Sequence, residues 1–217
     1  MRIDIISIFP EIFDALNFGI ISRAISKRII SIHHWNPRKF SKNEHGFIDD
    51  KPYGGGPGMV MCYEPLLNTL EKIKSNTQFE KRKIVCLSPS GDPFEHQTAQ
   101  ANSHLDQLII ICGRYEGIDQ RFIDNCVDET WSLGNFVISG GELAACCIID
   151  AITRLIPGTL GNPDSLTSES FTNDEYDYPV YTRPAIIDGH KVPKVLLEGN
   201  HSEIELWRKQ NRKTKED

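Results

Sequence analysis

The sequence predicts an α/β fold built around a mainly parallel sheet. Short aliphatic runs alternate along the chain with stretches in which apolar residues recur every three or four positions. The first pattern is typical of buried strands and the second of amphipathic helices. Their alternation favours strand–helix–strand units with parallel strands. Glycine-rich segments beside several strands are a third observation, because open α/β sheets bind ligands at the carboxyl ends of their strands.

Five stretches have the composition of strands. In chain order they are residues 2–9, 29–35, 83–87, 107–112 and 126–131. The third is expected to end at Ser88-Pro89-Ser90-Gly91, a sequence typical of a turn. The fourth runs straight into Gly113-Arg114-Tyr115-Glu116-Gly117.

Helices are expected between and after these strands. The first begins at Pro10, a residue suited to a first helical turn, and places Ile12, Phe13 and Leu16 on one face. The others cover residues 20–28, 64–74, 93–104 and 142–154, with a final helix from about residue 202. Residues 36–61 form a long loop, and loops of this length are usually functional or disordered.

Composition narrows the class of protein. The 217 residues are 39% hydrophobic and 25% charged with a net charge of −6, as in ordinary globular proteins. No apolar run reaches the roughly 18 residues that a membrane span requires, and Asp4 and Pro10 argue against a signal peptide. We therefore expect a cytoplasmic protein with no membrane partner.

The six cysteines are expected to be free, buried thiols. They are Cys62, Cys86, Cys112, Cys126, Cys146 and Cys147. None belongs to a C-x-x-C pair, which argues against both a zinc site and a disulfide framework. No metal site is predicted from the residues alone.

Several common enzyme classes are excluded by missing motifs. The chain has no G-x-G-x-x-G after a strand, no phosphate-binding loop with lysine, and no G-x-S-x-G elbow. Dinucleotide oxidoreductases, nucleoside triphosphatases and serine hydrolases are therefore disfavoured. The glycines that are present allow backbone groups to approach a flat ligand such as adenine, although each alone is typical of a tight turn.

Five ordered motifs resemble those of the bacterial tRNA (guanine-N1)-methyltransferases. They are Tyr53-Gly54-Gly55-Gly56-Pro57-Gly58-Met59, Cys112-Gly113-Arg114-Tyr115-Glu116-Gly117, Ser139-Gly140-Gly141-Glu142-Leu143, Tyr181-Thr182-Arg183-Pro184 and Gly199-Asn200-His201. The resemblance extends from residue 1 to about residue 210. It implies transfer of a methyl group from S-adenosylmethionine to N1 of the guanosine on the 3′ side of the anticodon, at tRNA position 37.

The resemblance also implies a fold. The family belongs to the SPOUT methyltransferases, whose parallel sheet has helices on both faces and a deep trefoil knot, a rare exception to unknotted topology. The implied organisation is a catalytic domain over residues 1–158, a flexible linker over 159–178, and a short, mostly helical tRNA-binding domain over 179–217. Because residues 159–174 are polar, we expect them to be mobile without RNA and to fold on binding it. The partners implied are tRNA and a second copy of the chain.

The donor pocket of the family is carried over residue by residue. The matching positions are Cys86, Leu87, Ser88, Gly113, Leu133, Gly134, Asn135, Phe136, Val137, Ile138, Gly140 and Gly141. Substrate contacts are implied for Arg114, Glu116, Asp50 and Gly58. The family is thought to use magnesium, so this ion remains open as a further requirement.

Guanine N1 carries a proton that has to leave before a methyl group can be added, so the reaction requires a general base. A cation near O6 would stabilise the negative charge that develops on the ring. Alignment on Ser170-Phe171 places the family's base at Glu169, where the family has aspartate, and its arginine at Arg154. Asp177 is a second candidate base and Asp174 a weaker one.

Two other functions fit the same residues. The glutamate at the base position is compatible with an RNA-binding module that has lost catalysis. An enzyme that uses S-adenosylmethionine on a different substrate is the second alternative. The presence of Arg154, Arg114 and Glu116 favours an active methyltransferase over the first of these.

Overall fold

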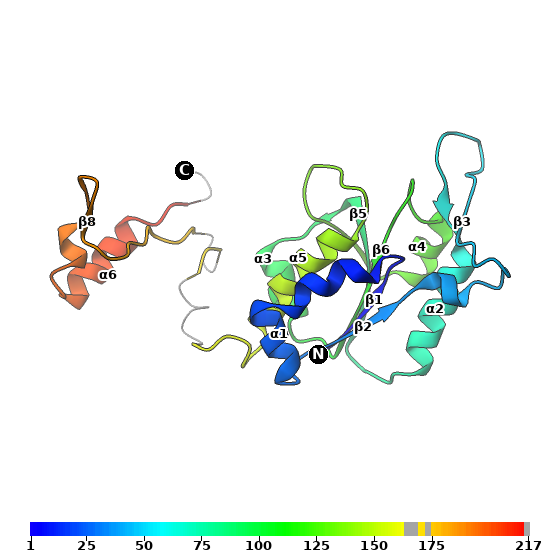
Figure 1. Cartoon of the computed structure of the whole chain (residues 1–217), viewed down its shortest axis with the longest axis horizontal. Coiled ribbons are helices and arrows are strands. Elements are labelled where there is room, and N and C mark those ends of the chain that lie inside the picture. Colours follow the sequence, from blue (N-terminus) through cyan, green and yellow to red (C-terminus); the bar gives the residue numbers. More distant parts are fainter. Residues whose placement is uncertain (163–168, 172–174, 215–217) are drawn as a thin grey trace. The chain divides into compact units, whose positions relative to one another are not determined.

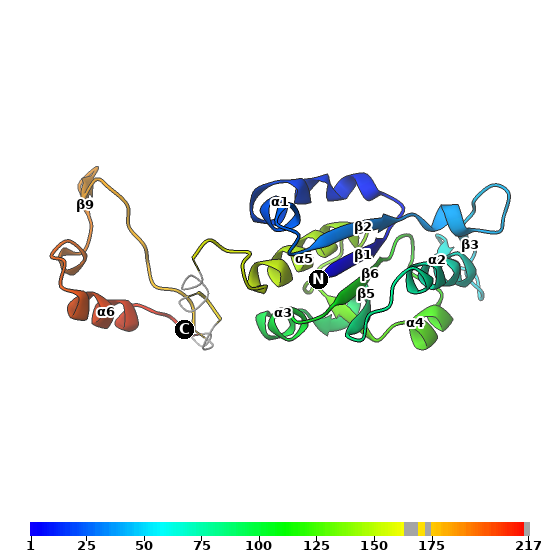
Figure 2. The ribbon, with the colours of Figure 1, turned by 90° about the horizontal axis from the view of Figure 1, so that it is seen from below.

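A five-stranded sheet forms the centre of the computed structural model, which describes residues 1–162, 169–171 and 175–214. The strand order is β2 (Ser31–Trp35), β1 (Arg2–Ile6), β6 (Gln107–Cys112), β5 (Arg82–Pro93) and β7 (Glu129–Ser132). Every neighbouring pair runs parallel, which confirms the α/β prediction. Figure 2 shows β2, β1, β6 and β5 side by side in this order.

Helices cover both faces because side chains of each strand alternate between them. Ile3 and Ile5 of β1 pack with the helices η1 (Pro10–Asn17), α1 (Gly19–Ser26), α3 (His96–Asn102) and α5 (Glu142–Leu155). Ile6, Ile109 and Ile111 pack on the other face with α2 (Tyr63–Ser75) and α4 (Gln120–Cys126). In Figure 1, α1 and α5 lie on one side of the strands, and α2 and α4 lie on the other.

Several predicted boundaries change. Strand β6 covers residues 107–112 as predicted, whereas β1 ends at Ile6 and the following turn is a 3₁₀ helix rather than an α-helix. The predicted strand over 126–131 is wrong at its start, because Cys126 closes helix α4. The loop over residues 36–61 contains the 3₁₀ helix η2 (Pro37–Phe40) and the paired strands β3 (Asp49–Asp50) and β4 (Val60–Met61).

Strand β5 is the largest departure. It was expected to end at residue 87 but continues to Pro93. Both Leu87 and Asp92 face Trp131 of β7, so residues 88–91 bulge out of the ladder between them. A Cβ atom on Gly91 would lie 2.6 Å from the carbonyl carbon of Thr130, so only glycine lets the bulge press against β7. The apparent turn is therefore a bulge within one strand.

Asp4 joins the three strands at one end of the sheet. Its buried carboxylate accepts hydrogen bonds from Arg2 (2.8 Å to both Nε and Nη2), Trp35 Nε1 (2.8 Å) and Gln107 Nε2 (2.7 Å). Burial alone would raise the pKa of Asp4, but these hydrogen bonds outweigh burial, so the pKa lies below its ordinary value. An ionised buried carboxylate thus connects side chains of β2, β1 and β6.

The chain divides into two compact units, Met1–Gly161 and Asn162–Asp217. The second contains a hairpin of β8 (Ile186–Ile187) and β9 (His190–Lys191), the short 3₁₀ helix η4 (Lys194–Leu196) and helix α6 (His201–Gln210). The guanidinium groups of Arg208 and Arg212 lie over the ring of Tyr178, at 5.0 and 5.8 Å from its centroid. Parts of the expected linker, residues 163–168 and 172–174, lie outside the described residues.

Candidate functional site

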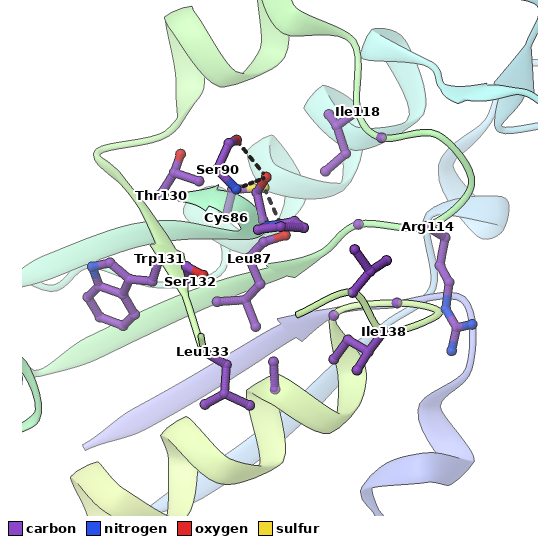
Figure 3. A pocket seen from close by; sticks show the side chains of 18 of the residues that line it. Cys86, Leu87, Ser90, Arg114, Ile118, Thr130, Trp131, Ser132, Leu133 and Ile138 are labelled. Carbon is purple, nitrogen blue, oxygen red and sulfur yellow. Dashed lines mark hydrogen bonds between the residues drawn. The ribbon is translucent and has the colours of Figure 1, made fainter. Parts of the chain in front are cut away.

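A cavity of about 580 Å³ opens at the carboxyl ends of β6 and β7 and beside the bulge of β5. This edge is where open α/β sheets bind ligands. Three segments provide most of the lining: residues 86–90 from β5, residues 113–118 after β6, and residues 130–134 and 136–141 from β7 onward. Figure 3 shows Leu87, Leu133 and Ile138 close together in this cavity.

The predicted donor residues converge on this cavity. Of the twelve positions, eleven line it, and Asn135 does not. Side chains of residues 133–138 are unusually exposed for apolar groups, with Phe136 at 54% and Val137 at 86%. An apolar wall left open to solvent is typical of a surface that a ligand covers.

The residues after β7 meet those after β6 at two glycines. The amide of Gly141 donates to the carbonyl of Gly113 at 3.0 Å. A Cβ atom on Gly141 would lie 2.9 Å from Cys112 Cα, whereas one on Gly113 would make ordinary contacts at 3.6 Å with Ile118 and Leu87. Gly141 is therefore required by the protein's own packing, and Gly113 leaves space on the cavity side.

Two buried thiols, Cys86 in the cavity lining and Cys112 in β6, are unreactive at neutral pH. Burial raises the pKa of the Cys86 thiol to about 12 and that of Cys112 well above its ordinary value. Both are neutral at pH 7, so neither is an activated nucleophile. All six cysteines are free, as expected, but only Cys86 and Cys112 are buried. Cys147 is exposed and Cys62, Cys126 and Cys146 are half-buried, so the prediction of buried thiols is wrong for these four.

Arg114, expected to contact substrate, is directed into the protein. Its Nε donates to Glu142 Oε2 at 2.9 Å and its Nη1 to the carbonyl of Ser139 at 3.1 Å. Its guanidinium lies 4.7 Å from the centroid of the Phe9 ring. In Figure 3 the Arg114 side chain points away from the labelled side chains around Leu87.

The other implied substrate residues, Glu116, Gly58 and Asp50, also belong to the first unit. The amide of Glu116 donates to the carbonyl of Met59 at 2.9 Å, which joins the two loops. Gly58 has a positive φ of 81°, and a Cβ atom there would lie 2.4 Å from Glu116 Cγ. Gly58 therefore makes room for the Glu116 side chain, while Asp50 belongs to the short strand β3.

The candidate catalytic residues belong to different units. Arg154 lies in the last turn of α5 in the first unit. Glu169, which is half-buried, and Asp177, which is exposed, belong to the second unit. The amide of Asp177 donates to Ser170 Oγ at 2.9 Å. Asp177 therefore lies beside the residue that directly follows Glu169 in the chain. Asp174 lies outside the described residues.

Sequence reasoning did not single out several residues that line the cavity. They are Pro89, Ser90, Tyr115, Gly117, Ile118, Gln120, Ile123, Thr130, Trp131, Ser132, Ser139 and Ala144. Tyr115, Gly117 and Ser139 lie inside quoted motifs, so their motif position was a usable signal. Gln120 and Ile123 belong to α4, a helix that was not predicted, and nothing in their local sequence marks them.

The described part of the chain lacks two features, a cluster of metal ligands and a membrane-spanning helix. Within residues 1–162, 169–171 and 175–214, no group of three or more histidine, cysteine, aspartate or glutamate side chains is arranged to hold a metal ion. Within the same ranges, no helix has the length and apolar character needed to cross a membrane.

Comparison with known proteins gives consistent matches. A family model described as tRNA (guanine-1)-methyltransferase TrmD matches residues 1–217. A tRNA (guanine-N(1)-)-methyltransferase of Buchnera aphidicola is 52% identical over 213 residues, with 94% of this chain and 86% of that protein covered. Proteins of the same name from Ralstonia nicotianae and Photobacterium profundum are 48% and 46% identical, covering 97% and 96% of this chain and 80% and 84% of their own lengths.

Proposed function

The chain belongs to the tRNA (guanine-1)-methyltransferase family, and from this premise we propose how its structure carries out methyl transfer to guanine N1 of tRNA. The methyl donor is S-adenosylmethionine, bound in the cavity at the ends of β6 and β7 and beside the bulge of β5. The acceptor is the guanosine on the 3′ side of the anticodon, at position 37. The protein acts in the cytoplasm.

The observation that carries the donor assignment is the cavity itself. Its volume of about 580 Å³ lies within the range of small-molecule sites. Its lining combines apolar side chains such as Leu133 and Ile138 with backbone at Gly113 and Gly140. This combination suits a ligand with a flat purine, whose edges hydrogen-bond to backbone groups and whose faces contact aliphatic side chains.

Bound S-adenosylmethionine supplies an electrophilic methyl group on a positively charged sulfur. The chain's own residues supply the proton chemistry. Glu169 accepts the N1 proton of guanine, and Arg154 stabilises the negative charge that spreads onto O6. As the carbon–sulfur bond breaks, the N1–carbon bond forms, and the N1 proton resides on the carboxylate. Asp177 is the alternative proton acceptor.

We further propose that the active site is shared between two chains of a homodimer. Arg154 belongs to the first unit and Glu169 to the second, which is compatible with the cavity of one chain receiving Glu169 from its partner. Apolar side chains on the first unit, such as Phe18 at 74% and Leu143 at 60% exposure, offer surface for such an association. Residues 179–217 form a short tRNA-binding domain, which residues 159–178 link to the catalytic domain.

A trefoil knot is proposed for the segment that carries the donor cavity. The chain after β7 returns to contact the end of β6 through the Gly141–Gly113 hydrogen bond and the Arg114–Ser139 hydrogen bond before it enters α5. These contacts bring together the two segments that such a knot would involve. We also propose magnesium as a requirement of the reaction.

A methyl-transfer assay tests the proposed function. Purified protein is supplied with labelled S-adenosylmethionine and an unmodified tRNA transcript that has guanosine at position 37. We expect label in tRNA at N1 of that base, and no label in a matched transcript with adenosine at position 37. Binding of tRNA without transfer would favour an RNA-binding module, and equal labelling of both transcripts would place the acceptor elsewhere.

A further inference from the structure

The Arg114 guanidinium is enclosed by the protein on several sides. Beside its bonds to Glu142 and Ser139 and the Phe9 ring, it occupies the space that a side chain at position 140 would fill: a Cβ atom on Gly140 would lie 2.2 Å from Arg114 Nε. Only 17% of the Arg114 side chain is exposed. Because Nε donates to a carboxylate and Nη1 to a carbonyl, these two nitrogens of the fork are committed to intramolecular partners.

Glu142 is the centre of this arrangement. It is fully buried, and while Oε2 accepts from Arg114, Oε1 accepts from Ser7 Oγ at 2.8 Å. A buried carboxylate is tolerated because both oxygens are paired. Glu142 is also the first residue of α5, where the helix dipole favours a negative charge. One side chain thus joins the chain after β1, the chain after β6 and the start of α5.

The segment held in this way is a wall of the cavity. Ser139, Gly140 and Gly141 all line it. Ser139 receives the hydrogen bond from Arg114, and Gly141 donates to Gly113. Residues 139–141 end the cavity-lining segment that follows β7. They are therefore held at Gly141 by a backbone hydrogen bond and at Ser139 by the Arg114 guanidinium.

We propose that Arg114 and Glu142 are positioning residues of the methyl-donor pocket, rather than contacts to the RNA. Their ion pair holds residues 139–141 at the place where the donor's cavity is formed. This inference rests on the proposed function, because it assigns the cavity to S-adenosylmethionine. It also reassigns Arg114, whose family resemblance implied a substrate contact.

The chain offers a matched control. Arg121 forms an ion pair with Asp119, at 2.6 Å between Nη2 and Oδ2, but its side chain is 71% exposed. It belongs to α4 of the same unit and is not among the residues that line the cavity. Arg121→Lys therefore makes the same chemical change as Arg114→Lys in an exposed ion pair neither of whose residues lines the cavity.

The experiment measures two affinities separately. Binding of S-adenosylmethionine is measured by calorimetry without tRNA, and tRNA binding is measured without donor, for the parent, Arg114→Lys, Glu142→Gln and Arg121→Lys. Loss of a charge-assisted hydrogen bond predicts that the donor Kd rises by about tenfold or more in the first two variants. We expect tRNA Kd to stay within about twofold, and Arg121→Lys to match the parent in both.

Kinetic constants distinguish a positioning role of Arg114 from a role in the chemical step and from a general loss of folded protein. In Arg114→Lys the KM for the donor should rise while kcat at saturating donor stays near the parent value, because bound donor restores the wall. Phe9→Leu is a milder second variant that keeps the ion pair and removes only the ring beneath the guanidinium. It should weaken donor binding by about twofold to fivefold even if the variants of the ion pair fail to fold.

Three outcomes decide the question. A parent that binds no S-adenosylmethionine would contradict the proposed function itself. A parent that binds donor, with Phe9→Leu and every folded ion-pair variant binding it equally well, would overturn only the positioning role. A fall in tRNA affinity with donor affinity intact would return Arg114 to the RNA contact that the resemblance implies.

Discussion

At the scale of single residues, alanine substitutions at two glycines that line the cavity are expected to affect stability differently. Gly141→Ala places a methyl group 2.9 Å from Cys112 Cα, so backbone has to shift. We expect a loss of about 1–3 kcal/mol in unfolding free energy, together with weaker donor binding. Gly113→Ala meets only ordinary contacts within the protein, so its stability should stay within about 1 kcal/mol of the parent.

Thermal unfolding and donor calorimetry check this pair. If Gly113→Ala is as stable as the parent but binds donor poorly, the added methyl group occupies space that the ligand uses. Equal donor affinity in Gly113→Ala and the parent would show that the ligand does not approach this residue. A fully stable Gly141→Ala would contradict the close packing of residues 112 and 141.

The general base is the second prediction at this scale. Glu169→Gln keeps the size of the side chain and removes its ability to accept a proton. Methyl transfer should fall by roughly a hundredfold to ten-thousandfold, as is typical for general acid–base groups, while donor Kd is unchanged. Glu169→Asp, which introduces the residue that the resemblance implies for the family's base, should retain substantial activity.

Asp177→Asn is the matched control for the base. Under the Glu169 assignment it should leave single-turnover methyl transfer within about tenfold of the parent. If Asp177→Asn abolishes transfer and Glu169→Gln does not, the proton goes to Asp177 instead. Single-turnover assays at saturating donor and tRNA separate this step from binding.

At the scale of the strands, the buried Asp4 carboxylate predicts a dependence of stability on pH. Its pKa in the folded chain lies below the ordinary value of 3.8. A lowered folded pKa contributes stability above the unfolded pKa, and that contribution is lost as the pH falls through the folded value. Unfolding free energy should therefore decline below about pH 4 more steeply in the parent than in Asp4→Asn.

Denaturant unfolding between pH 3 and pH 7 measures this effect. At pH 7, Asp4→Asn should cost about 3 kcal/mol, because the Arg2 cation loses its partner and the new amide hydrogens face donor groups. Glu129→Gln is a suitable comparison, since Glu129 pairs with Lys83 at a more exposed position. Parallel pH profiles for Asp4→Asn and the parent would contradict the lowered pKa.

The strands and helices also show how much of the fold could be predicted from the sequence. Strand β6 has an unbroken apolar run, and its bounds were predicted correctly because such a strand is buried on both faces. Strand β5 was cut short, because Ser88-Pro89-Ser90-Gly91 has the local chemistry of a turn and only pairing with β7 continues the strand beyond it. Helix α4 was not predicted, because Phe122 is its one buried side chain and a single apolar residue cannot reveal the periodicity of a helix.

The candidate site was predictable to a different extent. The glycine motifs located the cavity because backbone approach needs glycine at particular places, as at Gly141. The direction of the Arg114 side chain was not predictable. It depends on Ser7, Phe9 and Glu142, which the fold brings to Arg114 from distant parts of the sequence.

At the scale of the whole molecule, the proposed homodimer makes a quantitative prediction. Light scattering at micromolar concentration should give twice the mass of one chain. If each site takes Arg154 from one chain and Glu169 from the other, mixing inactive Arg154→Ala and Glu169→Gln proteins should restore activity. Random re-pairing makes half of the dimers mixed, each with one intact site, so about a quarter of the parent activity should return.

Re-pairing is achieved by co-expression of the two variants with different tags. No recovery in the mixed dimers would show that the two residues act within one chain. A monomer with full activity would contradict the shared site altogether. Mixing Arg154→Ala with itself under a second tag is the control for activity that arises from handling alone.

The strand order has a consequence for how the chain is made on the ribosome. Strand β1 is translated before β6, one of its two neighbours, which begins more than a hundred residues later. Until β6 emerges, β1 has only β2 beside it, and an isolated pair of strands is marginal in water. At 5–20 residues per second this interval lasts roughly 4–15 seconds. The nascent chain thus displays an unpaired apolar edge throughout that time, which makes it a natural client for chaperones that bind at the ribosomal exit.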